Sequence, residues 1–185
     1  MTGIRIFTAM LCLLLPFTTL AHNIHVGERV AAVGVADRGE LLFKEQKFSY
    51  KNWNSAQLAG KVRVIQHIAG RSSAKEQNAA LIEAIKAANF PHDHYQTTTI
   101  VNTDDAIPGT GMFVRSSIES NKQQFPWSQF IVDSDGAVHQ AWQLAGGGSV
   151  IVVLDKDARV RFVKEGALTQ EEVKTVIALL RELLH

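Results

Sequence analysis

Apolar and polar positions alternate along the chain in patterns that predict a strand, then a helix, from residue 61 onward. The segment 61–68 has the pattern of a strand, and we expect this strand to be buried on both faces. After the turn at 69–71, apolar residues recur at helical spacing, and the helix ends before Pro91 because proline disfavours helical geometry in the residue before it. Ser73 with Glu76 matches a capping box and predicts the start of this helix. Its expected buried face consists of Ala74, Leu81, Ile82, Ile85 and Ala88.

The remaining segments predict a second strand and helix, and then a hairpin followed by a final helix. Residues 95–102, rich in threonine, are typical of a strand, and a helix between the two strands brings them in parallel by a right-handed crossover. Thr169 and Glu172 predict the cap of the last helix. The other expected elements are a helix at 113–124, a short strand at 130–132 with a turn at 133–136, and hairpin strands at 150–154 and 160–163.

The first 21 residues have the pattern of a cleaved signal peptide. Arg5 precedes an apolar run at 6–15, and small residues stand at the positions that a signal peptidase reads before His22. A membrane anchor is the alternative, but the apolar run is shorter than the roughly 20 residues that span a bilayer. We therefore expect a signal peptide at 1–21, a periplasmic protein of one domain at 22–185, and no membrane insertion after cleavage.

Charge and cysteine content narrow the classes of function. The chain has 19 basic and 18 acidic residues, and loss of Arg5 with the signal leaves 18 of each. A neutral chain lacks the electrostatic surface that nucleic-acid binding needs, so we expect no nucleic-acid partner. Cys12, the single cysteine, lies within the signal segment, and the mature chain therefore forms no disulfide. We also expect no cofactor.

The predicted order, βαβα and then ββα, is that of an α/β protein with a thioredoxin-like fold, in which helices flank a central mixed sheet. Gly60-Lys61-Val62-Arg63-Val64 resembles the start of the first core strand in thioredoxin-like and peroxiredoxin-like proteins. Val152-Val153-Leu154-Asp155-Lys156-Asp157 resembles the hairpin of the same group. Ala158 stands where those proteins usually have glycine, which departs from the pattern of a tight turn.

Four longer segments carry a closer resemblance, at 66–76, 97–105, 111–117 and 126–133. They are similar to the YtfJ family of bacterial periplasmic proteins, over nearly the whole mature chain. The resemblance implies a thioredoxin-like fold and a periplasmic location, and it implies no particular reaction.

The resemblance to thioredoxins also implies which active-site residues are missing. Laid on the thioredoxin motif, Ser72 takes the position of the first cysteine and Lys75 that of the second. Ser149 falls where the cis-proline would stand. Because a serine hydroxyl cannot form a disulfide or act as a low-pKa thiolate, we expect no thiol-disulfide oxidoreductase or peroxidase activity.

The predicted helix start at 71–73 is the first candidate for binding. Free backbone N–H groups at a helix start favour an anion, and Arg71 would add a bidentate contact to a carboxylate or phosphate. The alternative is that Ser73 only caps the helix and Arg71 is solvated. The candidate ligand-binding residues at this start are Arg71, Ser72, Ser73 and Lys75.

Further candidates follow the second predicted strand, at the edge where open α/β sheets place their sites. Asp104 and Asp105 lie directly after it, Arg115 belongs to the next helix, and Ser149 follows three glycines at 146–148. A solvated loop is the alternative. We expect this loop and the 71–73 segment to open on the same edge, with a periplasmic or envelope protein, or a small anionic ligand, as the partner.

Two chemical alternatives remain. An enzyme would use Ser72 as nucleophile and His67 as base with Arg71 nearby, although the interpretation favoured for His67 is a buried neutral histidine bonded to a neighbour. A metal would need more ligands than the histidine pairs at 92 and 94 or at 22 and 25 supply, and we expect none.

Overall fold

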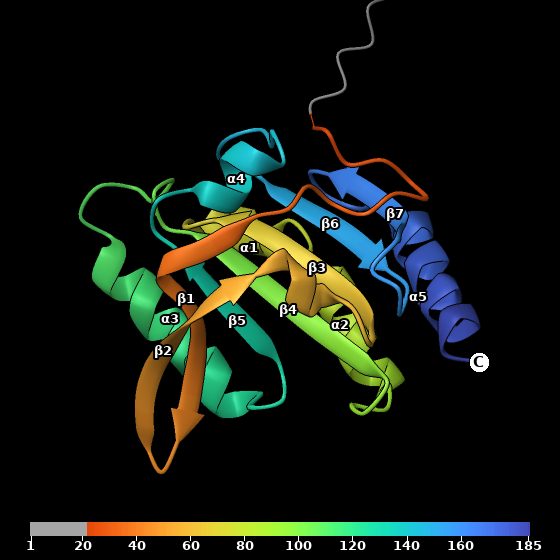
Figure 1. Cartoon of the computed structure of the whole chain (residues 1–185), viewed down its shortest axis with the longest axis horizontal. Helices are drawn as coiled ribbons and strands as arrows, with labels where there is room; N and C mark the ends of the chain where they lie inside the picture. Colours follow the sequence, from red (N-terminus) through yellow and green to blue (C-terminus); the bar gives the residue numbers. More distant parts are fainter. Residues whose placement is uncertain (1–21) are drawn as a thin grey trace, which may run out of the picture.

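A seven-stranded mixed sheet forms the centre of the protein in the computed structural model, which describes residues 22–185. The strand order is β2-β1-β5-β4-β3-β6-β7, with β3, β4 and β5 parallel and all other pairs antiparallel. Figure 1 shows the β1–β2 hairpin extending beyond one end of the sheet and α5 beside the other end. The strands are β1 Gly34–Lys44, β2 Lys47–Asn54, β3 Val62–Ala69, β4 Tyr95–Asn102, β5 Gln129–Asp133, β6 Ser149–Leu154 and β7 Val160–Glu165.

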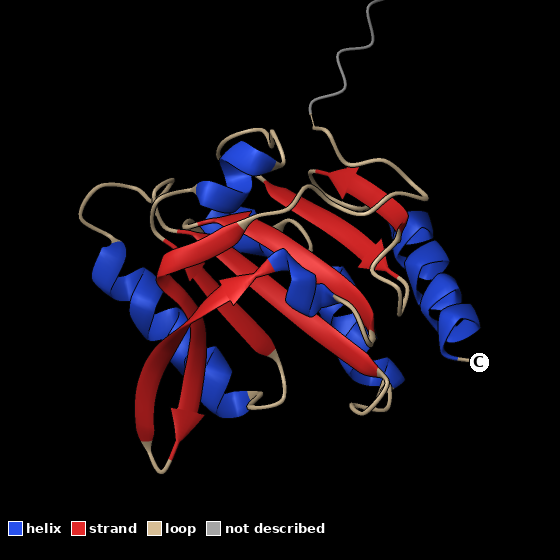
Figure 2. Ribbon diagram, viewed as in Figure 1, coloured by secondary structure: helices blue, strands red, loops and turns tan. Residues whose placement is uncertain are grey.

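Helices cover both faces of this sheet, as Figure 2 shows. They are the 3-10 helix η1 Ser55–Leu58 and the α-helices α1 Ser72–Glu76, α2 Ala79–Ala88, α3 Gly111–Gln124, α4 Ala137–Ala141 and α5 Gln170–Leu184. Since β3 leads to β4 and β4 to β5 by crossovers of the same hand, α1, α2 and α3 lie on one face. Helix α5 joins them there by packing against α2, and α4 and η1 cover the other face.

Alternation along the strands divides the core between the two faces. On strand β3, Val64 packs with Leu81 of α2 and Leu180 of α5, whereas Ile65 packs with Trp142 after α4. A third cluster joins Ile68 to Ile118 of α3. Because all of β3 is buried, the prediction of a strand covered on both faces is confirmed.

Most elements lie where the sequence pattern predicts them. Strand β4 covers 95–102 as expected, and helix α3 and the β6–β7 hairpin match their predicted segments closely. The α5 capping box is present, with the Thr169 side chain accepting from the Glu172 N–H. The hairpin turn forms without glycine because Ala158 itself takes the left-handed backbone conformation, at φ 60°.

The expected single helix after β3 and its capping box are wrong. The helix is interrupted between α1 and α2 because buried Asn78 hydrogen-bonds to distant segments of the chain and not within a helical turn. Helix α1 begins one residue early, with Arg71 at its N-cap and no side-chain cap. Ser73 is therefore the second residue inside the helix, from which its hydroxyl does not serve as the cap.

Residues 22–60 carried no structural prediction, yet they form the β1–β2 hairpin and η1. Strand β2 contains a partial alternation, with Phe48 and Tyr50 half-buried and Trp53 buried, which is the signal that was available. Gly39 permits a bulge in β1: its φ is +80°, and a Cβ there would lie 2.2 Å from the Lys51 carbonyl oxygen.

The predicted signal peptide at 1–21, with Cys12, lies outside the described residues. Within residues 22–185, none of the helices has both the length and the apolar character needed to cross a membrane.

Candidate functional site

Three loops meet at the carboxyl end of the parallel strands, around an ion pair between Arg71 and Asp105. Arg71 donates from Nε to the Asp105 carbonyl oxygen (2.9 Å) and from Nη2 to the Asp105 carboxylate. The second carboxylate oxygen accepts from the Gly147 N–H. The two loops expected to share one edge therefore touch each other, and the glycine-rich loop is tied to both of them.

These contacts stabilise the ionised form of Asp105. Burial by itself raises the pKa of the Asp105 carboxyl, but the hydrogen bonds from Gly147 and Arg71 and the guanidinium charge outweigh it and keep the pKa below its usual value. Asp105 is thus a carboxylate at neutral pH, and it already occupies the guanidinium that was expected to meet an anionic ligand. Asp105 thus takes the Nε and Nη2 side of the guanidinium, one of the two sides from which it can make a bidentate contact.

Ser149 also has hydrogen-bond partners within the protein. It is buried, its Oγ accepts from the Asn78 side-chain amide (3.1 Å), and its backbone N–H donates to the Gln77 side-chain oxygen (3.1 Å). Asn78 also donates to the Gly166 carbonyl and accepts from the Leu168 N–H, at 3.0 Å each. The break between α1 and α2 therefore anchors the segment where a thioredoxin would have its cis-proline.

His67 faces the side of the sheet opposite α1. The residue is 3% exposed, and its ring stacks toward His139 of α4, with 6.2 Å between ring centroids. Burial, with a smaller contribution from His139, lowers the pKa of His67 to about 4 against the opposing effect of Asp105, so the ring is neutral at pH 7. Within the described chain its Nε2 has no hydrogen-bond partner. His67 and Ser72 are therefore not joined as a base and a nucleophile.

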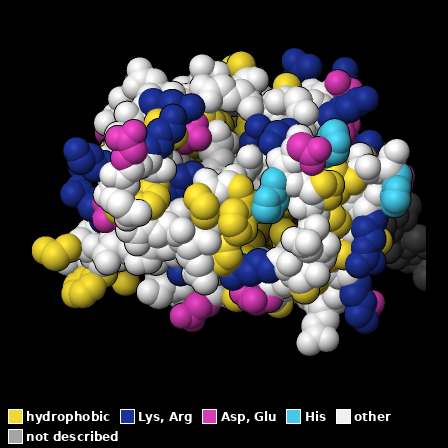
Figure 3. Space-filling view, turned by 90° about the horizontal axis from the view of Figure 1, so that it is seen from below, with side chains coloured by type: hydrophobic (Ala, Val, Ile, Leu, Met, Phe, Trp, Pro, Cys, Tyr) yellow, Lys and Arg dark blue, Asp and Glu magenta, His cyan; other side chains and the backbone are white. Residues whose placement is uncertain are grey.

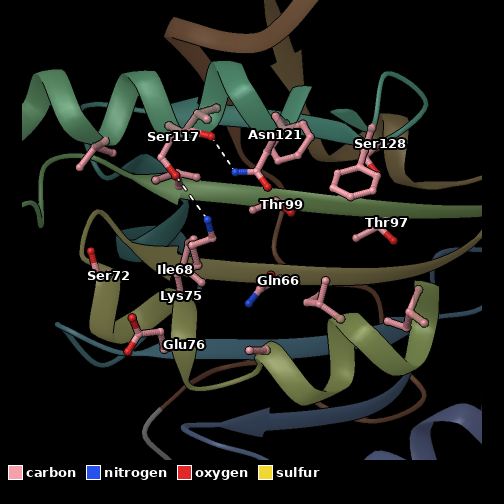
Figure 4. A pocket seen from close by; sticks show the side chains of 18 of the residues that line it. Gln66, Ile68, Ser72, Lys75, Glu76, Thr97, Thr99, Ser117, Asn121 and Ser128 are labelled. Atoms are coloured by element: carbon pink, nitrogen blue, oxygen red, sulfur yellow. Dashed lines mark hydrogen bonds between the residues drawn. The ribbon is translucent and has the colours of Figure 1, made fainter. Parts of the chain in front are cut away.

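A groove of about 1070 Å³ lies on the α1–α2–α3 face of the sheet. Figure 4 shows its floor, made by β3 and β4, between helix α3 on one side and helices α1 and α2 on the other. Ser72 and Lys75 line it from α1, and Lys75 Nζ reaches across to the Ser117 Oγ of α3 at 3.3 Å. The groove thus begins at the loop edge and continues along the sheet.

The floor of this groove is polar although it lies at the centre of the sheet. Gln66 projects from β3, and Thr97 and Thr99 project from β4, which has a strand on each side. The two threonines are partly exposed, and Thr97 Oγ1 pairs with the Tyr95 hydroxyl at 3.0 Å. Gln66 is 5% exposed, and its amide nitrogen has no hydrogen-bond partner among residues 22–185. This floor therefore offers hydrogen bonds that the protein does not use itself.

Aromatic side chains gather where β4 begins and α3 ends. His92 stacks on Trp127 with 4.6 Å between ring centroids, and Lys86 lies 4.6 Å from the centre of the Phe125 ring. Figure 3 shows hydrophobic, histidine and basic side chains around a hollow on the underside of the molecule. This end of the groove combines an apolar surface with nearby positive charge.

The remaining candidates do not join this arrangement. Ser73, Asp104 and Arg115 are exposed, and they do not line the groove. The Asp104 N–H donates to the Asn102 side-chain oxygen (3.1 Å), a local turn contact. In the part of the chain with described coordinates, no group of three or more His, Cys, Asp and Glu side chains is placed to hold a metal ion.

Sequence reasoning missed the floor of the groove. Its signal was the presence of Gln66 in a strand expected to be buried on both faces, together with Thr97 and Thr99 at alternate positions of the neighbouring strand. Polar side chains on a covered face need hydrogen-bond partners, so this pattern was informative. Nothing in the sequence indicated that α2 and α3 would be separated by a groove.

The family model described as a bacterial protein of unknown function, YtfJ_HI0045, matches residues 24–183. The chain belongs to this family. It is 65% identical to an uncharacterized protein, YtfJ, of Escherichia coli K12 over 98% of both chains. It is 46% identical to an uncharacterized protein of Haemophilus influenzae Rd over 90% of both chains.

Solved structures place the YtfJ fold among thioredoxin-like proteins. The thioredoxin domain of a thiol-disulfide oxidoreductase from Bacteroides vulgatus superposes with a TM-score of 0.55 at 11% identity, covering 85% of this chain and 99% of the other. A thiol-disulfide isomerase from Corynebacterium glutamicum gives 0.53 at 16% identity, covering 88% and 97%. The expected thioredoxin-like fold is therefore confirmed. At these identities the likeness concerns the fold alone.

Proposed function

We propose that this YtfJ-family protein is a periplasmic binding protein without redox function, exported by removal of residues 1–21, whose ligand occupies the groove between α2 and α3. Residues 22–185 contain no cysteine, so the mature chain has no thiol for disulfide exchange. Ser72 and Lys75 stand at the positions of the redox cysteines, and both line the groove. The edge that carries the active site in thioredoxins thus borders the proposed binding site without supplying chemistry to it.

The groove is the observation that carries this proposal. Its volume, about 1070 Å³, is slightly above the roughly 300–1,000 Å³ typical of small-molecule sites, and it combines apolar walls with a few polar groups on its floor. A small ligand is favoured over a folded protein partner because the binding surface is concave and lies between helices. The loop edge offers less, since Arg71 and Ser149 are already hydrogen-bonded within the chain.

An enzyme using Ser72 and His67 has weaker support. Ser72 lines the groove on one face, whereas His67 stacks toward His139 on the other. A general base must lie within hydrogen-bond reach of its nucleophile, directly or through one water. A binding role needs no such pairing.

The test uses the mature protein and a fluorescent apolar anion, 1-anilinonaphthalene-8-sulfonate. Ala79 is exposed and lines the groove, whereas its neighbour Ala80 is exposed outside it. We expect Ala79→Trp to fill the groove and lower probe binding at least fivefold, and Ala80→Trp to leave it unchanged. Circular dichroism checks that both variants fold.

Equal probe binding by the two tryptophan variants would contradict a site in the groove. Export is tested separately by mass spectrometry of the protein from a periplasmic fraction, where we expect His22 at the N-terminus. An intact chain beginning at Met1 would contradict cleavage.

A further inference from the structure

The Gln66 amide is the strongest indication of what the groove binds. Gln66 is 5% exposed, and its amide nitrogen has no hydrogen-bond partner in the described chain. A buried N–H donor without a partner is costly, and native proteins retain few of them. Figure 4 shows the side chain between β3 and the helices that border the groove. A bound ligand would supply the missing partner once a change in the Gln66 rotamer turned this nitrogen toward the groove.

A threonine hydroxyl lies on the neighbouring strand, on the same face of the sheet. Gln66 and Thr99 are paired residues in the parallel β3–β4 register, and both project toward the groove. The amide offers a donor and an acceptor, and the threonine hydroxyl serves as either. Together they form an uncharged site for a group that also carries both a donor and an acceptor. A peptide amide has this property.

The walls above this polar floor are aliphatic. Ile82 and Ile85 line the groove from α2, and Val114 and Ile118 line it from α3. Charged side chains lie at the rim on α1 and α2, with both signs present: Lys75, Glu76, Glu83 and Lys86. The groove therefore favours a ligand with an uncharged polar centre and apolar groups on both sides of it.

Other ligand classes match this arrangement less well. A simple acyl chain would leave the Gln66 amide unpaired against hydrocarbon, which is unfavourable. An oligosaccharide carries hydroxyl groups around its whole surface, and the isoleucine and valine walls would leave many of them unpaired. A peptide with apolar side chains avoids both costs.

We propose that the groove binds a short peptide segment, with one peptide amide hydrogen-bonded to Gln66 and Thr99 and with apolar side chains against Ile82 and Ile118. This inference rests on the proposed function, because it names the ligand class of the same groove. The site lies on the helix-covered face of the sheet and not at the loop edge formed by Arg71 and Asp105.

The experiment uses the ¹⁵N-labelled mature protein and the uncharged tripeptide N-acetyl-Leu-Ala-Leu-amide. Octyl glucoside below its micelle concentration and maltotriose serve as comparison ligands. We expect the tripeptide to shift the side-chain amide resonances of Gln66 and the backbone resonance of Thr99. Gln66→Leu should weaken tripeptide binding about tenfold, the effect expected for loss of the hydrogen bond to Gln66. Gln123→Leu, an exposed position on α3 outside the groove, is the matched control.

Folding of Gln66→Leu is checked by its urea midpoint, which should equal or exceed that of the wild type because the unpaired amide is gone. Shifts at Gln66 from octyl glucoside or maltotriose, with none from the tripeptide, would overturn the peptide assignment and leave groove binding intact. Equal tripeptide affinity in wild type and Gln66→Leu would overturn it as well. Failure of the Ala79→Trp test with the fluorescent anion would instead overturn the groove as the binding site.

Discussion

Replacing Asn78 by alanine should destabilise the protein strongly although it lies outside the groove. The side chain is 1% exposed and makes three hydrogen bonds, to the Ser149 hydroxyl, the Gly166 carbonyl and the Leu168 N–H. These bonds join the α1–α2 break to segments 71 to 90 residues later in the sequence. The loss of Asn78 leaves all three partners without their bond.

The expected magnitude follows from these three contacts. At about 1 kcal/mol for each hydrogen bond, Asn78→Ala should lower the free energy of unfolding by about 3 kcal/mol. Gln77→Ala, which removes a single contact to the Ser149 N–H, should lower it by about 1 kcal/mol. The measurement is urea denaturation of the mature protein followed by circular dichroism, with an unchanged slope showing that the same surface is exposed on unfolding.

A loss below 1 kcal/mol for Asn78→Ala would refute this reasoning. It would mean that water replaces the amide at all three partners, or that α1 and α2 rejoin as one continuous helix. A crystal structure of the variant separates those two explanations. A loss equal to that of Gln77→Ala would likewise show that the three contacts do not act together.

Two further predictions concern ionisable groups. The pKa of His67 is lowered to about 4 in the folded state from 6.5, so the unfolded chain takes up a proton first, and stability should fall by about 3 kcal/mol between pH 6.5 and 4. Urea titrations at several pH values should show this loss in wild type and in the control His92→Gln but not in His67→Leu. The same dependence of the free energy of unfolding on pH in all three proteins would contradict the prediction. Asp105→Asn should cost about 1 kcal/mol at pH 7, discounted for partial exposure of the ion pair. The pKa of Asp105 is lowered in the folded state, so the difference in the free energy of unfolding between wild type and Asp105→Asn should persist above about pH 4 and shrink as the pH falls through the folded pKa. A difference that does not change with pH would exclude a role for the charge.

Much of the fold was predictable because local patterns and tertiary packing agree. The β3 and β4 strands, the final capping box and the β6–β7 hairpin each follow from residues close in sequence. The break between α1 and α2 was not predictable from the local pattern. Residues 72–88 have helical spacing throughout, and Asn78 interrupts the helix through partners that only the folded chain brings near.

The candidate site was also predictable only in part. The sequence placed Arg71 and Asp105 at one edge of the sheet, and the structure joins them. It did not indicate that they would pair with each other, since a pairing between two loops depends on their exact paths. The groove was also missed as a whole, because its existence depends on the separation of α2 and α3. Its one indication in the sequence was the set of polar residues on its floor, Gln66, Thr97 and Thr99.

Helices α2 and α3 border the groove but are held by different neighbours. Helix α2 packs on α5, whereas α3 packs on β1 and β5. Among the described residues, Lys75 with Ser117 and Lys86 with Phe125 connect the two sides. For protein engineering, the α3 wall of the proposed groove can therefore be changed without touching the α2–α5 packing, whereas Ile85 of α2 both lines the groove and belongs to the cluster with α5. Substitutions on the inner side of α3 would adjust the selectivity of the proposed binding site.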